Sequence, residues 1–359
     1  MTTETSPRDL ELHTSSSLNT STPELNTPEL LEDVDSPVED AKDIPHILII
    51  TDIGHDADDA MALAIMAKRH AMKKIKIVGV IATLKPEVMK RAKMALWMLR
   101  EFDIEDVEVA KGTDGTERRQ DPFGYEFVKR SERLGDSLIT KDYLDLATRV
   151  FENASRTGSG LHVLSIGGHR DVWAIMSNNK DLTWKAVSQI HIQGGCYFGK
   201  ATVDKESPSE EEIAAAAATP DLLRPNFDAA NNNFDRDASR NLYTFLAGEA
   251  GIKTVTYTKE AAAKASFKPE IFESLVVAND PLAAIGCAGI VGDSVLNPQT
   301  VGALSHMLQI GQEVNSTKLR DALREQLSQT LGQKYPTFHE GTSALSQTGF
   351  GLPPRTPTC

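Results

Sequence analysis

Apolar residues follow two alternating patterns along this chain from residue 44 onward. Short apolar, β-branched runs that end in glycine or a polar turn are typical of buried strands, and they occupy 46–52, 75–83, 107–112, 161–168 and 187–195. Apolar residues three or four positions apart predict helices at 57–71, 86–102 and 316–331. Strands that alternate with helices predict an α/β fold, with an open, mostly parallel (mixed) β-sheet covered by helices on both faces.

Three of the predicted strands end in polar or glycine residues. They are Asp52, Gly167-Gly168 and Gly194-Gly195. The carboxyl ends of parallel strands lie at one edge of a sheet, and sheets of this kind bind ligands there. We therefore expect the functional site at this edge.

Two segments differ from this pattern. Residues 1–44 are rich in Ser, Thr, Pro and Glu and contain the near-repeat TPEL. Too few apolar residues are present to offset the entropy of ordering, so we expect a disordered acidic tail before a single domain at 45–359. The tail is either a regulatory segment or a dispensable extension. Residues 197–228 are polar, then alanine-rich, then broken by prolines, which predicts a long loop with a short helix. This insertion is either a lid over the site or a passive surface segment.

Composition and charge exclude some functions. The chain has 359 residues, of which 40% are hydrophobic and 25% charged, as in ordinary globular proteins. Residues 1–44 hold 11 acidic and 2 basic side chains, so most of the net charge of −13 lies there and the body is nearly balanced. Without clustered Lys and Arg, a nucleic-acid-binding groove is not expected.

Cysteine usage and hydropathy indicate a cytoplasmic protein. Cys196, Cys287 and Cys359 are far apart and form no CxxC pair, so we expect free thiols in a reducing compartment. No apolar run approaches the roughly 20 residues of a membrane span, and the acidic start is unlike a targeting peptide. We therefore expect no membrane partner.

An acidic loop stands out in the stretch ILIITDIGHDADDAMAL at 47–63. A buried strand ends at Asp52, and Asp56, Asp58 and Asp59 follow before or at the start of a helix. Capping explains one of them, Asp58, but not all four. Carboxylates this close repel one another unless a cation joins them, and Ca²⁺ prefers such oxygen ligands. A solvated acidic turn is the alternative. The stretch fits neither an EF-hand nor a DxDx[TV] phosphatase motif.

TDIGHDADDAMAL resembles the N-terminal signature of the inosine-uridine-preferring nucleoside hydrolase family, DTDxGxDxDDAxAL. Weaker similarities follow in the order that the family has, over roughly 46–290. They are LHVLSIGGHRDVWAI at 161–175, QGGCYFG at 193–199, NNNFDRDAS at 231–239 and NDPLAAI at 279–285. The resemblance implies an open α/β sheet, a Ca²⁺ ion at the strand ends, and hydrolysis of the N-glycosidic bond of a small nucleoside-like substrate. It also implies a homo-oligomer, a dimer or tetramer.

Site residues come from the resemblance position by position. The calcium ligands would be Asp52, Asp59, Asp280 and the backbone carbonyl of Ile166. Asp52 would also be the base that activates water, as the chemistry of glycoside cleavage requires. The ribose contacts would be Asp58 and either Asn231 or Asn232.

Several positions depart from the family pattern. Ile50 occupies the position of the family's first aspartate, and Lys200 that of a ribose-binding asparagine. Ala229 replaces a glutamate, for which Asp228 is a possible substitute in contacting the substrate. Asn279 replaces a histidine thought to assist the leaving base; it could contact substrate, but it cannot act as an acid.

Three histidines have competing interpretations. His55 is either a site residue or a turn residue. His169 follows a strand end and is either a replacement acid or, more simply, a solvent-facing helix cap. His191 lies in an apolar strand, which favours a satisfied core histidine.

The sequence thus leaves three functions open. The first is a calcium-dependent hydrolase of a ribonucleoside or related N-riboside, with a part in nucleoside catabolism. The second is a non-catalytic or repurposed relative that binds a ribosyl-like ligand. The third is hydrolysis of another bond in a specialised metabolite by the same metal-activated water.

Overall fold

A computed structural model describes residues 44–334, with gaps at 55–56, 116–127, 200–208, 212–213, 215–221, 249–250, 266–278, 302–303 and 312. The predicted tail, apart from Ile44, lies outside the described residues. So do His55, Asp56 and Lys200.

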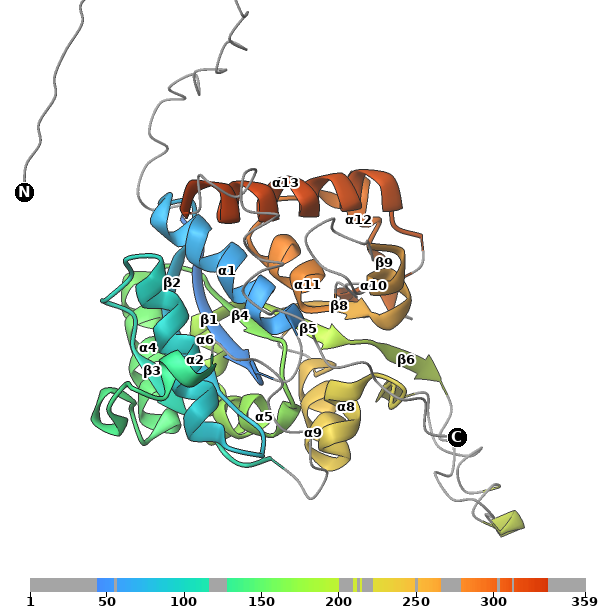
Figure 1. Cartoon of the computed structure of the whole chain (residues 1–359). Coiled ribbons are helices and arrows are strands. Elements are labelled where there is room, and N and C mark those ends of the chain that lie inside the picture. Colours follow the sequence, from blue (N-terminus) through green and yellow to red (C-terminus); the bar gives the residue numbers. More distant parts are fainter. Residues whose placement is uncertain are drawn as a thin grey trace, which may run out of the picture. The chain divides into compact units, whose positions relative to one another are not determined.

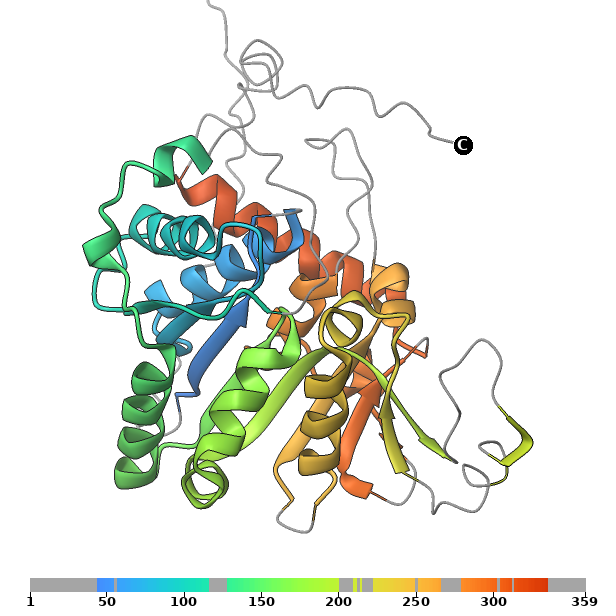
Figure 2. The same cartoon turned by 90° about the horizontal axis from the view of Figure 1, so that it is seen from below.

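An eight-stranded sheet forms the centre of the fold, in the order β3-β2-β1-β4-β5-β8-β10-β9 (Figures 1 and 2). Neighbouring strands are parallel, except that β9 runs antiparallel to β10. This arrangement confirms the predicted open, mostly parallel mixed sheet. The strands are β1 (His46–Thr51), β2 (Lys76–Ala82), β3 (Val109–Lys111), β4 (Leu161–Ser165), β5 (Val187–Gly194), β8 (Lys253–Thr258), β9 (Gln299–Val301) and β10 (Leu304–Ile310).

Helices cover both faces of the sheet, as predicted (Figure 2). One hydrophobic cluster joins the sheet to α1 (Ala57–Ala71), α2 (Val88–Glu101), α10 (Lys259–Ala265), α11 (Asn279–Cys287), α12 (Asp293–Leu296) and α13 (Ser316–Lys334). The other joins it to α4 (Tyr143–Thr157), α5 (His169–Asn178), α6 (Lys180–Ala186) and α9 (Arg236–Leu246). Short helical turns, α3 (Val128–Ser131), η1 (Asp136–Leu138) and α8 (Ala230–Phe234), complete the described connections.

Strand β1 shows why the central strands read as continuous apolar runs. Ile47 and Ile49 pack into the first cluster, whereas Leu48 and Ile50 pack into the second, and all four are fully buried. A strand with helices on both faces has no polar side. Ile50 is therefore a core residue, where the resembled family has a carboxylate.

The chain reverses its direction of travel across the sheet between β1 and β4. From β1 it proceeds to β2 and β3 on one side, and later to β4 and β5 on the other. Ligands of doubly wound sheets bind outside the carboxyl ends of the strands at such a switch point. The pairing continues past β4, because the Ile166 amide donates to the Ile50 carbonyl at 2.9 Å. Asp52 and Ile166 consequently lie at the same edge of the sheet.

The ends of the 197–228 insertion are strands, so the prediction of a loop is wrong there. β6 (Cys196–Gly199) and β7 (Leu222–Pro225) pair antiparallel in a separate two-stranded sheet. Tyr197 and Phe198 supply aromatic side chains that favour strands. Most of the segment between these strands lies outside the described residues, and its function as a lid stays a prediction.

Gly167 packs directly against the β1 backbone at the switch point of the sheet. A Cβ at this position would lie 2.9 Å from the Asp52 amide nitrogen and 3.1 Å from the Thr51 carbonyl carbon. We expect Gly167→Ala to lower the free energy of unfolding by about 1–3 kcal/mol, as overpacking does. Chemical unfolding measures this, with Gly292→Ala as the control, because a Cβ on Gly292 would meet no atom within 4 Å. Equal losses in the two variants would contradict this account.

Candidate functional site

Three buried carboxylates meet at the carboxyl edge of the sheet. Asp58 and Asp59 lie in the first turn of α1, and Asp280 lies in the first turn of α11. Oxygen atoms of the three side chains lie within 4.8 Å of one another, and the residues are 8%, 3% and 4% exposed. Helices α1 and α11 pack against each other, which brings together residues more than 200 positions apart. The site is therefore a product of the tertiary fold.

The loop between β1 and α1 is held by its own hydrogen bonds. Gly54 turns the chain with a φ of 116°, a conformation that favours glycine. The Thr51 hydroxyl donates to the Asp59 carboxylate and accepts a bond of 3.2 Å from the Ile53 amide. The Asp59 amide donates to Asp58 Oδ1 at 3.1 Å. Together with the helix N-terminus, these donors favour ionised carboxylates at this point.

Asp52 lies directly after β1 and is 2% exposed. It is not one of the three carboxylates that meet within 4.8 Å, but it is joined to them through the loop. Its backbone carbonyl accepts a hydrogen bond from Arg91, a side chain of α2 that is 1% exposed. Arg91 also donates to the carbonyls of Ile53 at 3.1 Å and Pro86 at 3.3 Å.

Arg91 is a functional candidate that the sequence analysis missed. Its guanidinium is a buried positive charge beside an acidic loop, and it fixes the backbone carbonyls of Asp52 and Ile53. The available signal was an arginine on the buried face of an amphipathic helix, next to Ala92 and one turn before Ala95.

Ile166 and Asn231 lie together. The Asn231 side-chain amide donates to the Ile166 carbonyl at 3.0 Å and to Gln193 Oε1 at 2.7 Å. A carbonyl oxygen has two lone pairs, so the Ile166 oxygen keeps one for a further partner. Gln193, at the end of β5 and 6% exposed, is a second residue that sequence reasoning missed.

Asn232 has different partners from Asn231. Its side-chain amide donates to the carbonyls of Gly195 at 2.8 Å and Asn226 at 2.7 Å, so it fixes the chain around β6 and β7. The sequence left the choice between these two asparagines open. The structure places Asn231, rather than Asn232, against the Ile166 carbonyl.

His169 is fully buried, so the interpretation as a solvent-facing cap is wrong. Ser239 donates to the Asn232 carbonyl at 2.9 Å, so its hydroxyl accepts from His169 Nδ1 at 3.0 Å. Burial lowers the pKa of His169 to about 4, although the backbone of Gln193 opposes the shift. A neutral imidazole at pH 7 is a poor proton donor.

Two further predicted substrate contacts are Asp228 and Asn279. Asp228 is exposed in the turn after β7, and its neighbour Ala229 is buried. Asn279 begins α11, directly before Asp280, but its side chain lies outside the described residues.

The donor set suits a hard divalent cation. The three side chains that meet are carboxylates, and carboxylate oxygens are ligands that Ca²⁺ takes in loose geometry. Nitrogen and sulfur ligands, which transition metals prefer, belong to a separate cluster described below. Over the residues that the structure describes, no helix has the length and apolar character needed to cross a membrane.

Comparisons with solved structures identify the fold. The type III effector protein XopQ, complexed with adenosine diphosphate ribose, matches with a TM-score of 0.65 and 20% identity over 80% of this chain and 95% of that one. The plant nucleoside hydrolase PpNRh1 matches with a TM-score of 0.52 and 14% identity over 79% of this chain and 98% of that one. The inosine-uridine preferring nucleoside hydrolase from Bacillus anthracis matches with a TM-score of 0.51 and 13% identity over 79% of this chain and 99% of that one.

No protein-family profile and no curated protein match the chain by sequence. The structural matches nevertheless span most of each protein, so the chain has the nucleoside hydrolase-like fold. At identities of 20% or less, these comparisons establish the fold and do not assign an activity.

The buried His169 predicts a pH-dependent stability. Below pH 6.5 the unfolded chain binds a proton that folded His169 refuses until about pH 4. Stability is therefore lost as the pH falls through this window, by up to about 1.4 kcal/mol per pH unit. His169→Asn keeps a donor for Ser239 and removes the titration, so its free energy of unfolding should depend less on pH. Urea unfolding of both proteins across the window measures this; parallel curves would contradict it.

Proposed function

We propose that this protein hydrolyses the N-glycosidic bond of a ribonucleoside or a related N-riboside in a calcium-dependent reaction. The observation that carries the proposal is the meeting of Asp58, Asp59 and Asp280 at the switch point of the sheet. Isolated buried charges are very unfavourable, and a cation that joins carboxylates removes this cost. The fold, shared with nucleoside hydrolases, supports the same assignment.

Asp52, Asp59, Asp280 and the Ile166 carbonyl are the proposed calcium ligands. Bound Ca²⁺ would neutralise the carboxylates, orient ribose hydroxyls and increase the acidity of a neighbouring water. In this proposal Asp52 accepts the proton of the attacking water, while Arg91 and Thr51 hold the loop that carries it. Asp58 and Asn231 contact the ribose.

The leaving base receives little help from the described residues near the site. Asn279 cannot protonate it, and His169 is buried with its pKa lowered to about 4. Cleavage then depends on a base that departs without a strong acid. We therefore propose a riboside with a good leaving group as the preferred substrate class.

A second function is favoured by one comparison. XopQ, a structure in complex with adenosine diphosphate ribose, has a higher TM-score than the nucleoside hydrolases reported above. With Ile50 and Asn279 in place of polar family residues, the site also suits binding of an ADP-ribose-like ligand without hydrolysis. Asp58 would then contact the ribose in a stable complex.

The hydrolase proposal predicts that Asp52→Asn lowers the rate of ribose release by about 10²–10⁴-fold, since the general base is lost. Reducing-sugar release from inosine, uridine and p-nitrophenyl riboside in the presence of Ca²⁺ measures this, and the nitrophenyl compound should react fastest. Asp237→Asn is the matched control, because its exposed carboxylate on α9 pairs with Arg240. Unchanged turnover in Asp52→Asn would overturn the assignment.

The binding alternative predicts calorimetric binding of ADP-ribose that strengthens with Ca²⁺ and is lost in Asp58→Ala, but not in Asp237→Ala. Circular dichroism spectra of both variants check that each is folded. Such binding without ribose release from any riboside would favour the second function over hydrolysis. Binding that is equal in both variants would contradict a ribosyl contact at Asp58.

A further inference from the structure

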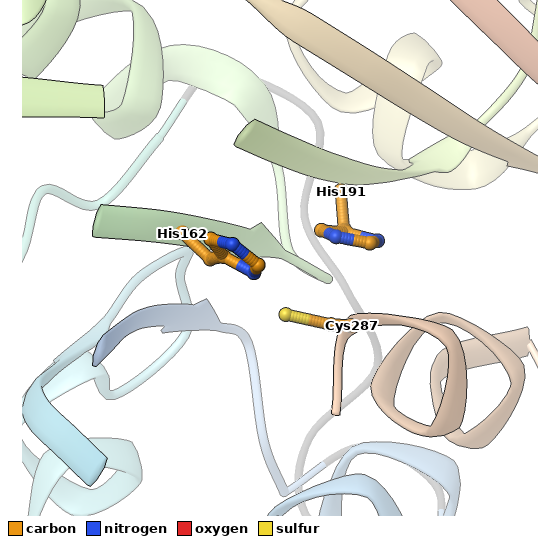
Figure 3. Close-up of side chains that lie close together, drawn as sticks. All are labelled: His162, His191 and Cys287. Atoms are coloured by element: carbon orange, nitrogen blue, oxygen red, sulfur yellow. The ribbon is translucent and has the colours of Figure 1, made fainter. Parts of the chain in front are cut away.

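A second cluster of ligating side chains lies on the same face of the sheet as α11. Figure 3 shows His162 from β4, His191 from β5 and Cys287 from the end of α11 pointing into one space. A ring nitrogen of each histidine and the Cys287 sulfur lie within 4.8 Å of one another. His191 and Cys287 are 2% and 3% exposed.

This cluster is separate from the carboxylates. Helix α11 begins beside Asp280 and ends at Cys287, seven residues later. At 1.5 Å per residue, the two positions lie about 10 Å apart along the helix. The cluster therefore takes no part in the proposed ribosyl site.

The histidines are in the form that binds metals. Burial lowers the pKa of His162 and of His191, and the charge of Lys253 acts in the same direction. Both rings are accordingly neutral at pH 7, with a lone pair on one nitrogen. Neutral imidazole is the ligating form.

Each of the two histidines has a ring nitrogen that makes no hydrogen bond to the described residues. His191 Nδ1 lies 2.8 Å from the Tyr257 hydroxyl, which orients the ring. Among the described residues, neither His191 Nε2 nor His162 Nδ1 has a hydrogen-bond partner, although both atoms are buried. Buried polar atoms without partners are rare in native proteins, and the binding of an ion is one explanation for them. The interpretation of His191 as a satisfied core histidine accounts for one of its two nitrogens.

A nucleophilic cysteine is a weaker interpretation of the cluster. Burial raises the pKa of the Cys287 thiol, so the reactive thiolate is disfavoured without a metal. A divalent cation would instead stabilise the thiolate and release its proton.

We propose that His162, His191 and Cys287 bind one Zn²⁺ ion. Two imidazoles and a thiolate are a donor set that zinc prefers and Ca²⁺ does not. Tetrahedral zinc bonds would place the donor atoms roughly 3.4–3.7 Å apart, so a small contraction of the cluster completes the site. The fourth position is left for a water or a small ligand, and Tyr257 orients the His191 ring from outside the ligand set.

The expected consequence is a link between three elements. Zinc would join β4, β5 and the end of α11, and so fix the helix whose first turn carries Asp280. The proposal concerns metal binding alone and does not depend on any activity at the carboxylate site.

Cobalt titration tests the proposal. Full-length protein, reduced and freed of metals with a chelator, is titrated with Co²⁺. We expect one Co²⁺ per chain with a thiolate-to-cobalt charge-transfer band in the near ultraviolet, and we expect Zn²⁺ to abolish the band. A protein that shows no such band and no stoichiometric Zn²⁺ binding would overturn the proposal.

Variants assign the band to this cluster. Cys287→Ser, close in size to cysteine, should abolish the band, whereas the controls Cys196→Ser and Cys359→Ser should keep it. His162→Asn changes a partly exposed ligand, and it should weaken Zn²⁺ binding by more than the roughly 10–100-fold expected for the outer Tyr257→Phe. Asp280→Asn should leave Zn²⁺ binding unchanged. Circular dichroism without metal checks folding, and a band that survives Cys287→Ser would place the metal elsewhere.

Discussion

The parallel pairing of β1 with β4 is the constraint on which the site depends. Leu48 pairs with Val163 and Ile50 with Ser165, and the Ile166 amide continues the ladder to the Ile50 carbonyl. These strands are neighbours in the sheet but far apart in sequence, and their ends form the switch point, where doubly wound sheets bind ligands. The close contact at Gly167 leaves no room for a side chain between them. The elements that follow β1 and β4 therefore start from fixed positions.

The same geometry brings buried negative charges together. Burying carboxylates is costly, and the fold places three of them at helix N-termini that pack together. Backbone and hydroxyl donors, such as Thr51, favour their ionised form. Arg91 brings a buried positive charge to the carbonyls of Asp52 and Ile53 at the start of the loop. The arrangement concentrates negative potential at one point, where a divalent cation contributes most.

Local patterns predicted the fold where periodicity was strong. Helix α1 has the predicted bounds of 57–71, and β1 ends within one residue of its prediction, because both have long apolar repeats. Strands β8 and β10 were missed because KTVTYT and LSHMLQI mix polar and apolar residues. These strands lie toward the end of the sheet that carries β9, away from the switch point.

The site was harder to predict than the fold, because its members come together only through packing. No local feature relates Asp280 to Asp59, and only the resemblance to a known family connected them. Arg91 reads locally as one charged residue on a helix, and the burial of His169 depends on Ser239 in a distant helix. For Arg91 and His191, the signal available from sequence was a polar residue inside an apolar pattern.

Helix α11 relates the two donor clusters to each other. Its first turn contributes a carboxylate to an all-oxygen set, and its last residue contributes a thiol to a nitrogen and sulfur set. Hard and soft donors select different cations, so the two proposed sites would differ in metal preference although one short helix contributes to both. Because both clusters also include residues from the sheet or from helices packed on it, movement of α11 would disturb them together. The position of this one helix is thus the structural variable that the two sites share.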